Sequence, residues 1–224
     1  GVIKTFPGFW IQRLETTEKE YLQFINDPNT IQIIDNAAAR GQLIYLPREN
    51  GVISKSWKRK DSTYTASPFP DEAVRHISFD DCVAYCEWRT AKAKEKGIPF
   101  EFTLASEEEW ERAARGADGR DFPWGNSFDW TFCNSSWSFP SRKQLYDAVY
   151  FPRDESPFSI MSMAGNLLEF TSTPGYRDQL YIGKGGASGS LRVEHFRAAK
   201  KYNMHHSLGI GFAGFRMVAR SAIK

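Results

Sequence analysis

Apolar residues recur at helical spacing in four stretches of the first half of the chain, and boundary residues of the kind that start or end helices accompany them. Thr17 stands three residues before Glu20, which is the spacing of a capping box, and Tyr21 and Phe24 then lie on one helix face. Ser106 is followed by three acidic residues, which suit the positive end of the helix dipole. The predicted helices span 17–26, 31–40, 78–96 and 106–115.

Helical spacing disappears beyond Gly116. The second half consists of glycine, proline, asparagine, serine and aromatic residues with short apolar stretches such as 212–218. A similar stretch at 43–46 is a candidate strand within the connecting segment 42–75. Helices combined with short, turn-separated strands predict an α+β fold with a few short antiparallel strands. Because neither repeats nor a change of composition divides the chain, we expect one domain over 1–224.

Aromatic residues make up 15% of the chain, and 17 glycines and 11 prolines accompany them. Each aromatic ring buries a large area, so we expect a loop-rich fold around an aromatic core. No apolar run approaches the roughly 18 residues of a membrane span, and a net charge of +2 is spread along the chain without a basic cluster. We therefore expect neither membrane insertion nor a nucleic-acid partner.

The chain has three cysteines, Cys82, Cys86 and Cys133. They cannot all pair, and the first two stand four residues apart on one predicted helix, a poor geometry for a disulfide. We expect reduced, buried thiols, which favours a cytoplasmic location. No charged-then-apolar leader opens the sequence, and its first residue is Gly1 rather than Met, as in a domain taken from a longer protein.

Two neighbouring segments in the middle of the chain carry a family resemblance. Residues 102–116 read FTLASEEEWERAARG and residues 118–126 read DGRDFPWGN, which is similar to the signature of the formylglycine-generating (sulfatase-modifying factor) family. Further matches occur in the same order at 8–11, 21–24, 74–88, 156–170, 185–186 and 214–216. The resemblance implies the C-type-lectin-like fold of that family, which agrees with the α+β prediction.

Catalytic members of the family carry two cysteines after a Gly-Gly-Ser motif, and these bind copper and use oxygen to oxidise a substrate cysteine to formylglycine. Carried onto this chain, the two positions fall near Ser190 and His195. A hydroxyl and an imidazole do not replace the two soft thiolates that hold Cu(I). The resemblance therefore implies a non-catalytic member that binds no copper.

The details of three segments, 118–125, 128–129 and 132–134, look most like two non-catalytic varieties of the family. One variety lies C-terminal to bacterial serine/threonine kinases, and the other forms the variable proteins of diversity-generating retroelements. Both imply a bacterial ligand-binding or sensory domain, attached in the first case to a kinase or other effector domain. The sequence leaves the choice between them open.

A calcium site is also implied by the resemblance. The family's ligands fall on the carbonyls of Gly165 and Leu167 and the carboxylate of Glu169, but Ser162 stands where an Asn or Asp is expected. Calcium prefers six to eight oxygens with net negative charge, so we expect weak binding or none. In the alternative interpretation Asn166 and Glu169 tie down a turn by hydrogen bonds.

In this fold, the segment after the paired glycines holds the active site of enzymes and the ligand-contacting face of the retroelement proteins. Here that segment joins aromatic, charged and hydrogen-bonding residues, a composition enriched in recognition surfaces. We predict that the exposed part of 188–206 recognises a protein or small-molecule ligand. The candidate contact residues are Ser188, Ser190, Arg192, Glu194, His195, Tyr202, Asn203, His205 and His206.

The alternative function is a metal-dependent oxygenase or other oxidoreductase whose chemistry differs from formylglycine generation. It would use His195 with other ligands. His205 and His206 are adjacent, so on a strand they face opposite ways and on a helix they diverge by about 100°, and neither arrangement is a ligand pair. Metal content after purification separates the two hypotheses.

Overall fold

The structure is a computed structural model that describes residues 7–66, 69–138, 148–207 and 209–222. Its α-helices confirm the predicted ones, with bounds that differ by three residues or fewer. They are α1 (Glu18–Ile25), α2 (Pro28–Ala38), α3 (Phe79–Glu95) and α4 (Glu107–Arg115), and 3-10 turns span η1 (Ala148–Tyr150) and η2 (Val193–Phe196).

Side chains at the N-termini explain why the helices begin where they do. The side chains of Thr17, Ser78 and Ser106 each accept a hydrogen bond from the backbone N–H three residues later. The carboxylate of that later residue in turn accepts a hydrogen bond from the backbone N–H of the cap residue. Helix α2 begins earlier than predicted, because Asp27 caps it and Pro28 occupies its first position. This Asp-Pro start lies outside the apolar spacing on which the prediction rested.

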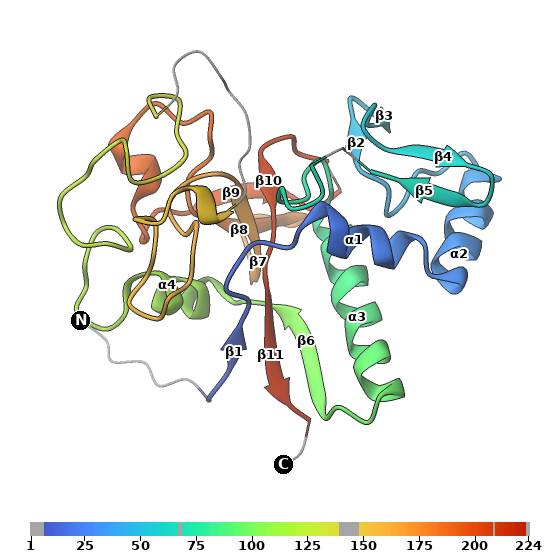
Figure 1. Ribbon diagram of the computed structural model, residues 1–224, viewed down its shortest axis with the longest axis horizontal. Helices are drawn as coiled ribbons and strands as arrows, with labels where there is room; N and C mark the ends of the chain where they lie inside the picture. Colours follow the sequence, from blue (N-terminus) through green and yellow to red (C-terminus); the bar gives the residue numbers. More distant parts are fainter. Residues whose placement is uncertain (1–6, 67–68, 139–147, 208, 223–224) are drawn as a thin grey trace.

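Short strands form two sheets and two separate hairpins (Figure 1). The strands are β1 (Trp10–Ile11), β2 (Arg48–Glu49), β3 (Val52–Ile53), β4 (Lys58–Lys60), β5 (Thr63–Thr65), β6 (Phe100–Leu104), β7 (Leu168–Pro174), β8 (Leu180–Lys184), β9 (Tyr202–His205), β10 (Ala213–Gly214) and β11 (Met217–Ser221). One sheet has the order β1-β11-β6 and the other β10-β7-β8-β9. These pairs are antiparallel apart from the short parallel pair β10–β7.

The predicted strand at 43–46 is wrong. Tyr45 has a φ of 62°, in the left-handed region, which interrupts an extended backbone. The strands of this region lie further along the chain in the hairpins β2–β3 and β4–β5, next to Asn50 and Asp61 at positive φ. The apolar stretch contributes to the core instead, through the buried side chain of Leu46.

Aromatic rings build the main core, as the composition predicts. Tyr21 stacks on Tyr85 with ring centroids 5.5 Å apart, and Phe24 and Phe215 meet Tyr85 edge-on. A second cluster surrounds Trp110 on α4. All three cysteines are buried and free, which confirms the expectation of buried thiols.

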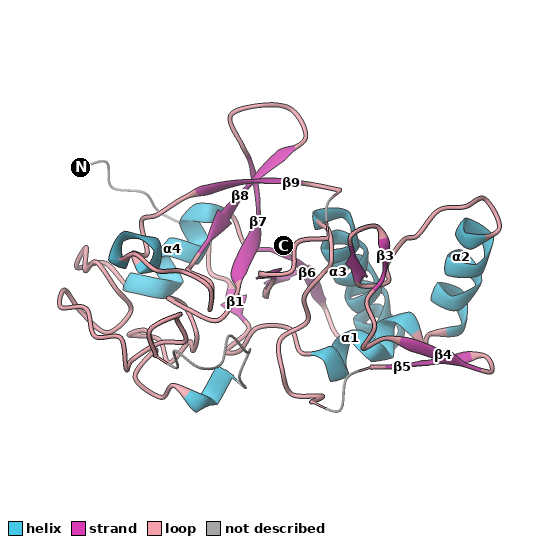
Figure 2. Ribbon diagram, turned by 90° about the horizontal axis from the view of Figure 1, so that it is seen from above, coloured by secondary structure: helices cyan, strands magenta, loops and turns pink. Residues whose placement is uncertain are grey.

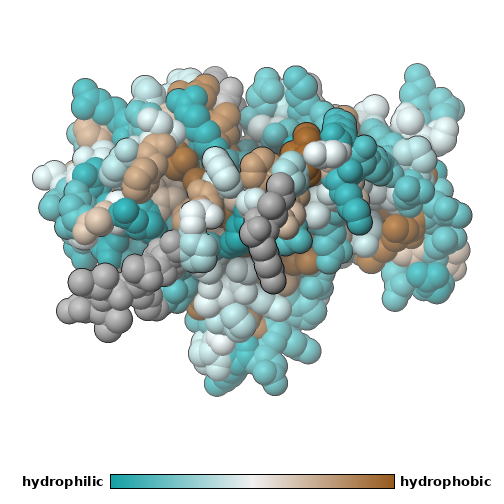
Figure 3. All heavy atoms as spheres, turned by 90° about the horizontal axis from the view of Figure 1, so that it is seen from below, coloured by the Kyte–Doolittle hydropathy of each residue, from teal (hydrophilic) through white to brown (hydrophobic). Residues whose placement is uncertain are grey.

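Long loops form one end of the molecule, and the loop between β7 and β8 lies at one of its edges. Helix α3 lies along β6 and α4 lies beside β7 and β8, while α2 and the two hairpins form the end opposite the loops of 117–138 and 185–200 (Figure 1). The loop between β7 and β8 projects from the body (Figure 2). Viewed from below, the described residues show small apolar patches among hydrophilic ones (Figure 3). Among the described residues, no helix has the length and apolar character needed to cross a membrane.

Candidate functional site

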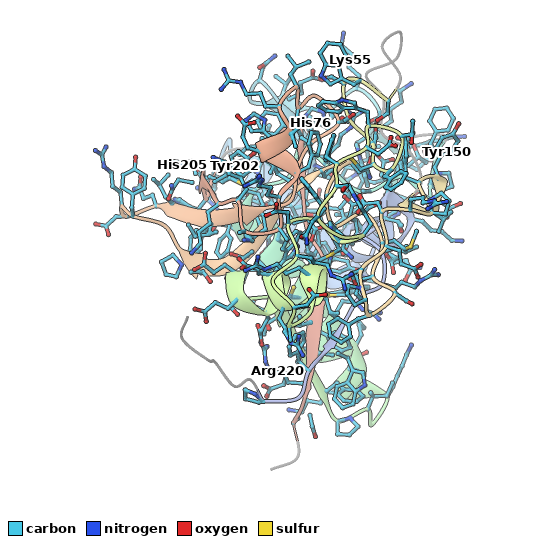
Figure 4. The ribbon with its side chains drawn as sticks, turned by 90° about the vertical axis from the view of Figure 1, so that its left-hand side faces the viewer. Lys55, His76, Tyr150, Tyr202, His205 and Arg220 are labelled. Carbon is cyan, nitrogen blue, oxygen red and sulfur yellow. The ribbon has the colours of Figure 1, made fainter. Side chains whose placement is uncertain are left out.

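The predicted ligand segment is divided between two parts of the structure. Residues 188–196 form a loop and the turn η2, and the loop is hydrogen-bonded to residues 136–137. Tyr202 and His205, by contrast, lie on the edge strand β9 of the four-stranded sheet (Figure 4). The two parts have different contacts and are considered in turn.

Hydrogen bonds hold the loop that precedes η2. The hydroxyl of Ser190 accepts from the backbone N–H of Ala187 at 3.2 Å, and its carbonyl accepts from the backbone N–H of Ser136 at 3.3 Å. The indole N–H of Trp137 donates to the carbonyl of Leu191 at 3.1 Å. Ser190, at one of the two expected cysteine positions, therefore stabilises a turn.

Ser188 and Arg192 on this loop, and Glu194 in the turn η2 that follows it, present polar groups. The side chains of Arg192 and Glu194 are 74% and 52% exposed, and Nη1 of Arg192 lies 3.6 Å from Oε1 of Glu194. The backbone N–H of Glu194, followed by the charges of Arg192 and His195, lowers the pKa of the Glu194 carboxyl. Exposed ion pairs of this kind add little to stability, so both side chains are available to a ligand.

Aromatic side chains lie beside the same loop. The rings of Trp130 and Trp137 are 5.8 Å apart, and Trp130 meets Phe196 edge-on at 6.0 Å. Trp137 is 52% exposed and Leu191 is 60% exposed, so an apolar surface adjoins the polar groups. These aromatic residues were not predicted as contacts, because only the density of aromatics in 122–137 distinguishes them in the sequence.

His195 and Tyr202 connect the two parts. Their ring centroids are 6.0 Å apart in an edge-on arrangement, and the Tyr202 hydroxyl donates to the His195 carbonyl at 3.5 Å. Burial raises the pKa of Tyr202 to about 12, and the charge of Glu194 adds to the effect. His195, at the second expected cysteine position, therefore packs against a neutral tyrosine.

Alternation along β9 sends its side chains to opposite faces of the sheet. Met204 is buried, whereas Asn203 and His205 belong to the other face. The side-chain oxygen of Asn203 accepts from the backbone N–H of Tyr176 at 3.2 Å. Nδ1 of His205 accepts from the backbone N–H of Ser207 at 3.3 Å, so its Nε2–H donates to the side chain of Gln179, also at 3.3 Å. Asn203 and His205 thus hold the β7–β8 loop in place.

His206 connects β9 to helix α3. It lies just beyond the end of β9, so its ring stacks on that of His205 with centroids 5.1 Å apart, and the prediction that the two rings face opposite ways is wrong. Nδ1 of His206 lies 2.8 Å from Oδ2 of Asp80, and its carbonyl accepts from the backbone N–H of Phe79 at 2.8 Å. Asp80 sits in the first turn of α3, where the helix dipole stabilises a carboxylate. The pair therefore fixes the orientation of the imidazole.

The thiols do not form a metal centre with these residues. Burial raises the pKa of Cys82, Cys86 and Cys133, which disfavours thiolate formation. Among the described residues, no three His, Cys, Asp or Glu side chains are grouped so as to hold a metal ion.

Glu169, the carboxylate of the expected calcium site, is paired with a buried arginine. Arg216 donates from Nη2 to Oε1 at 2.6 Å and from Nε to Oε2 at 2.7 Å, and the indole N–H of Trp110 adds a bond of 2.8 Å. Asn166 donates to Glu15 at 2.8 Å and accepts from Asn134 at 2.9 Å. Glu169 and Asn166 therefore make hydrogen bonds of the kind expected in the alternative interpretation, in which they tie down a turn.

Two further buried carboxylates, those of Asp154 and Glu15, lie near the pair of Glu169 and Arg216. Asp154 accepts from the backbone N–H groups of Met163 and Ala164 at 3.1 Å each, beside Ser162. Burial raises the pKa of Asp154 to about 7. Burial, with the charge of Glu169, raises the pKa of Glu15 to about 8. The sequence analysis predicted neither acid, because Glu15 lies 151 residues before Asn166 in the chain and no motif marks Asp154.

Comparison with known proteins identifies the family to which the chain belongs. The model of the sulfatase-modifying factor enzyme 1-like domain (FGE-sulfatase) matches residues 3–221. The "Inactive C-alpha-formylglycine-generating enzyme 2" of Bos taurus is 33% identical over 110 residues, which are 45% of this chain and 32% of that protein. The "Hercynine oxygenase" of Mycolicibacterium smegmatis is 26% identical over 213 residues, covering 84% of this chain and 45% of that protein. The chain thus spans less than half the length of these relatives.

Solved structures show the same fold. "Treponema denticola variable protein 1" superposes with a TM-score of 0.68 at 13% identity, covering 95% of this chain and 84% of that one. PvdO from Pseudomonas aeruginosa gives a TM-score of 0.63 at 18% identity, covering 95% and 80%. These likenesses confirm the predicted α+β fold of the formylglycine-generating type.

Proposed function

Since the chain belongs to the sulfatase-modifying factor enzyme 1-like family, we propose that it is a non-catalytic member that binds a protein or small-molecule ligand through the exposed part of 188–206. The observation that carries the proposal is the role of Ser190 and His195. At the positions of the two catalytic cysteines, one side chain closes a turn and the other packs on a tyrosine. Neither supplies a thiolate for copper.

The surface around these positions suits recognition. Arg192 and Glu194 are exposed on a loop that hydrogen bonds hold in place, and Trp137 and Leu191 add an apolar area beside them. Aromatic and arginine side chains dominate many interfaces, and the backbone of a loop held by hydrogen bonds has little entropy left to lose on binding. The relative named as inactive supports the same interpretation.

The similarity to a hercynine oxygenase favours one second candidate, an oxidoreductase with altered chemistry. It requires metal ligands. Among the described residues, which include His195, no three His, Cys, Asp or Glu side chains are grouped so as to hold a metal ion. His205 uses both ring nitrogens in bonds to its neighbours, and Nδ1 of His206 faces Asp80. The geometry therefore favours the binding domain over the oxygenase.

A peptide assay and a metal analysis test the absence of catalysis. We expect no conversion of the cysteine in a Cys-x-Pro-x-Arg peptide to an aldehyde when the protein is incubated with copper, reductant and oxygen. We also expect no stoichiometric iron or copper after purification. Aldehyde above a no-protein control, or one equivalent of metal, would overturn the proposal.

Photocrosslinking tests the binding surface. We would place p-benzoylphenylalanine at Leu191 or, as a control on strand β6, at the exposed Glu101. In extracts of the native host we expect a discrete adduct from position 191 alone, and its loss when Arg192→Ala and Glu194→Ala are added. Equal labelling from both positions would contradict this placement.

A further inference from the structure

The loop between β7 and β8 forms a pocket that the sequence did not suggest. An open pocket of about 430 Å³ is lined by residues 174–181 together with His206. The loop projects from the body of the molecule (Figure 2), and His205 lies at the same edge (Figure 4). The volume is within the range of small-molecule sites in proteins.

The pocket is built on a fixed loop. The backbone N–H of Gly175 donates to the carbonyl of Leu180 at 2.7 Å, which closes the loop at its base. A Cβ at Gly175 would lie 2.6 Å from the side-chain oxygen of Asn203 and 2.8 Å from Cβ of Leu180, so any larger residue would force the two sides of the loop apart. Asn203 and His205 add the bonds to Tyr176 and Gln179 described above. The loop is therefore organised before a ligand arrives.

Arg177 supplies the positive charge of the pocket. Its guanidinium carbon lies 5.1 Å from the centroid of the Tyr176 ring, and it has no ion pair with any carboxylate in the described part of the chain. An arginine stacked on an aromatic ring keeps its edge N–H groups for a planar or tetrahedral oxyanion. Asp178 follows in the same lining, and its carboxylate offers oxygens that only accept hydrogen bonds.

His206 supplies a hydrogen-bond acceptor. In the neutral ring, the bond to the carboxylate of Asp80 places the proton on Nδ1, so Nε2 carries the lone pair. No hydrogen bond within the described residues uses Nε2. The pocket therefore offers a ligand the guanidinium of Arg177 as a donor, and His206 and Asp178 as hydrogen-bond acceptors.

We propose that this pocket binds a small molecule that combines a carboxylate or phosphate group, recognised by Arg177, with hydroxyl or amine hydrogens, recognised by His206 and Asp178. This proposal rests on the proposed function, since both assign ligand binding to the domain. It places the small-molecule site at the β7–β8 loop and leaves the loop of Arg192 to a separate contact.

Backbone NMR titration tests the pocket. The probes are gluconate and glucose 6-phosphate, with glucose as the uncharged comparison. We expect saturable chemical-shift changes of the amides of 174–181 and 206 with the two acids. The apparent dissociation constant for glucose should be at least tenfold higher than for either acid. The tighter of the two acids identifies the preferred oxyanion. Absence of saturable shifts with both acids, or equal affinity for glucose, would overturn the proposal.

Variants assign the roles of the residues. Arg177→Gln should weaken binding of both acids at least tenfold, and Arg192→Gln, on the other loop, should leave it unchanged. His206→Gln should weaken binding as well. If that variant disturbs the spectrum far from the pocket, Asp80→Ala replaces it, since it removes the acceptor of the Nδ1 proton, no longer fixes the lone pair on Nε2 and should likewise weaken binding. Unchanged affinity in Arg177→Gln would overturn the proposal, while crosslinking at position 191 would still report on the proposed function independently.

Discussion

The buried polar centre and the exposed loop before η2 use their hydrogen-bonding capacity in opposite ways. Around Arg216, every guanidinium nitrogen donates within the protein, to Glu169 and to backbone carbonyls from two distant segments. On the loop, Arg192 has a single long ion pair with Glu194 and is mostly exposed. A fully used arginine specifies the fold, whereas a largely unused one is free for recognition.

The largest expected effect comes from removing the central cation. Arg216→Met leaves the carboxylate of Glu169 buried without its partner and close to Glu15. Breaking a buried ion pair on one side costs about 3–5 kcal/mol. Urea unfolding should show this loss, while the matched Arg192→Met should change stability by less than about 0.5 kcal/mol. Similar costs for both variants would mean that the two regions do not differ as described.

Glu15 gives the centre a pH dependence that the exposed loop lacks. Its pKa is about 8 in the folded protein against an ordinary 4.5, so between these values the folded state binds more protons than the unfolded state. Stability therefore falls as pH rises through this window, by at most about 1.4 kcal/mol per pH unit for one group. Asp154, with a pKa of about 7, acts in the same direction.

Glu15→Gln should accordingly flatten the decline of stability between pH 5 and 8 and make the variant more stable than the wild type at pH 8. Thermal or urea unfolding at several pH values measures this. Glu194→Gln is the matched control, since its carboxylate is exposed and its pKa is lowered rather than raised. An identical slope in wild type and Glu15→Gln would contradict the role given to Glu15.

A sharper test lies within the predicted ligand segment itself. Tyr202 is half-buried against His195, whereas Arg192 is exposed. We expect Tyr202→Ala to cost about 2 kcal/mol through lost apolar burial, and Arg192→Ala to cost less than about 0.5 kcal/mol. Chemical denaturation separates these values. If Tyr202→Ala were as mild as Arg192→Ala, Tyr202 would belong to the exposed part of the segment, as the sequence analysis predicted.

The elements that the sequence predicts well are those whose signals are local. Thr17, Ser78 and Ser106 cap helices through residues three positions away, so their spacing is visible in the sequence. The strand expected at 43–46 fails because backbone conformation at Tyr45, not apolar content, decides the outcome.

The candidate site depends mainly on distant contacts. Trp137 meets Leu191 across 54 residues, and His206 meets Asp80 across 126. The sequence analysis chose the segment 188–206 because family motifs flank it. It did not predict that Asn203 accepts a hydrogen bond from Tyr176 and so supports the β7–β8 loop. Which side chains remain available to a ligand follows only from these pairings, and they leave no periodic signal in the sequence.

The smallest expected effect concerns calcium at the polar centre. Arg216 already occupies both oxygens of Glu169, and a cation would have to displace it or lie beside its positive charge. We therefore expect no change of melting temperature with excess calcium relative to chelator, whereas a ligand at a hundred times its dissociation constant would stabilise by about 2.7 kcal/mol, a shift of several degrees. Magnesium at the same ionic strength controls for screening. A calcium-specific rise of several degrees, reduced in Glu169→Gln, would show that the centre is a metal site and that its contrast with the exposed loop has been drawn too strongly.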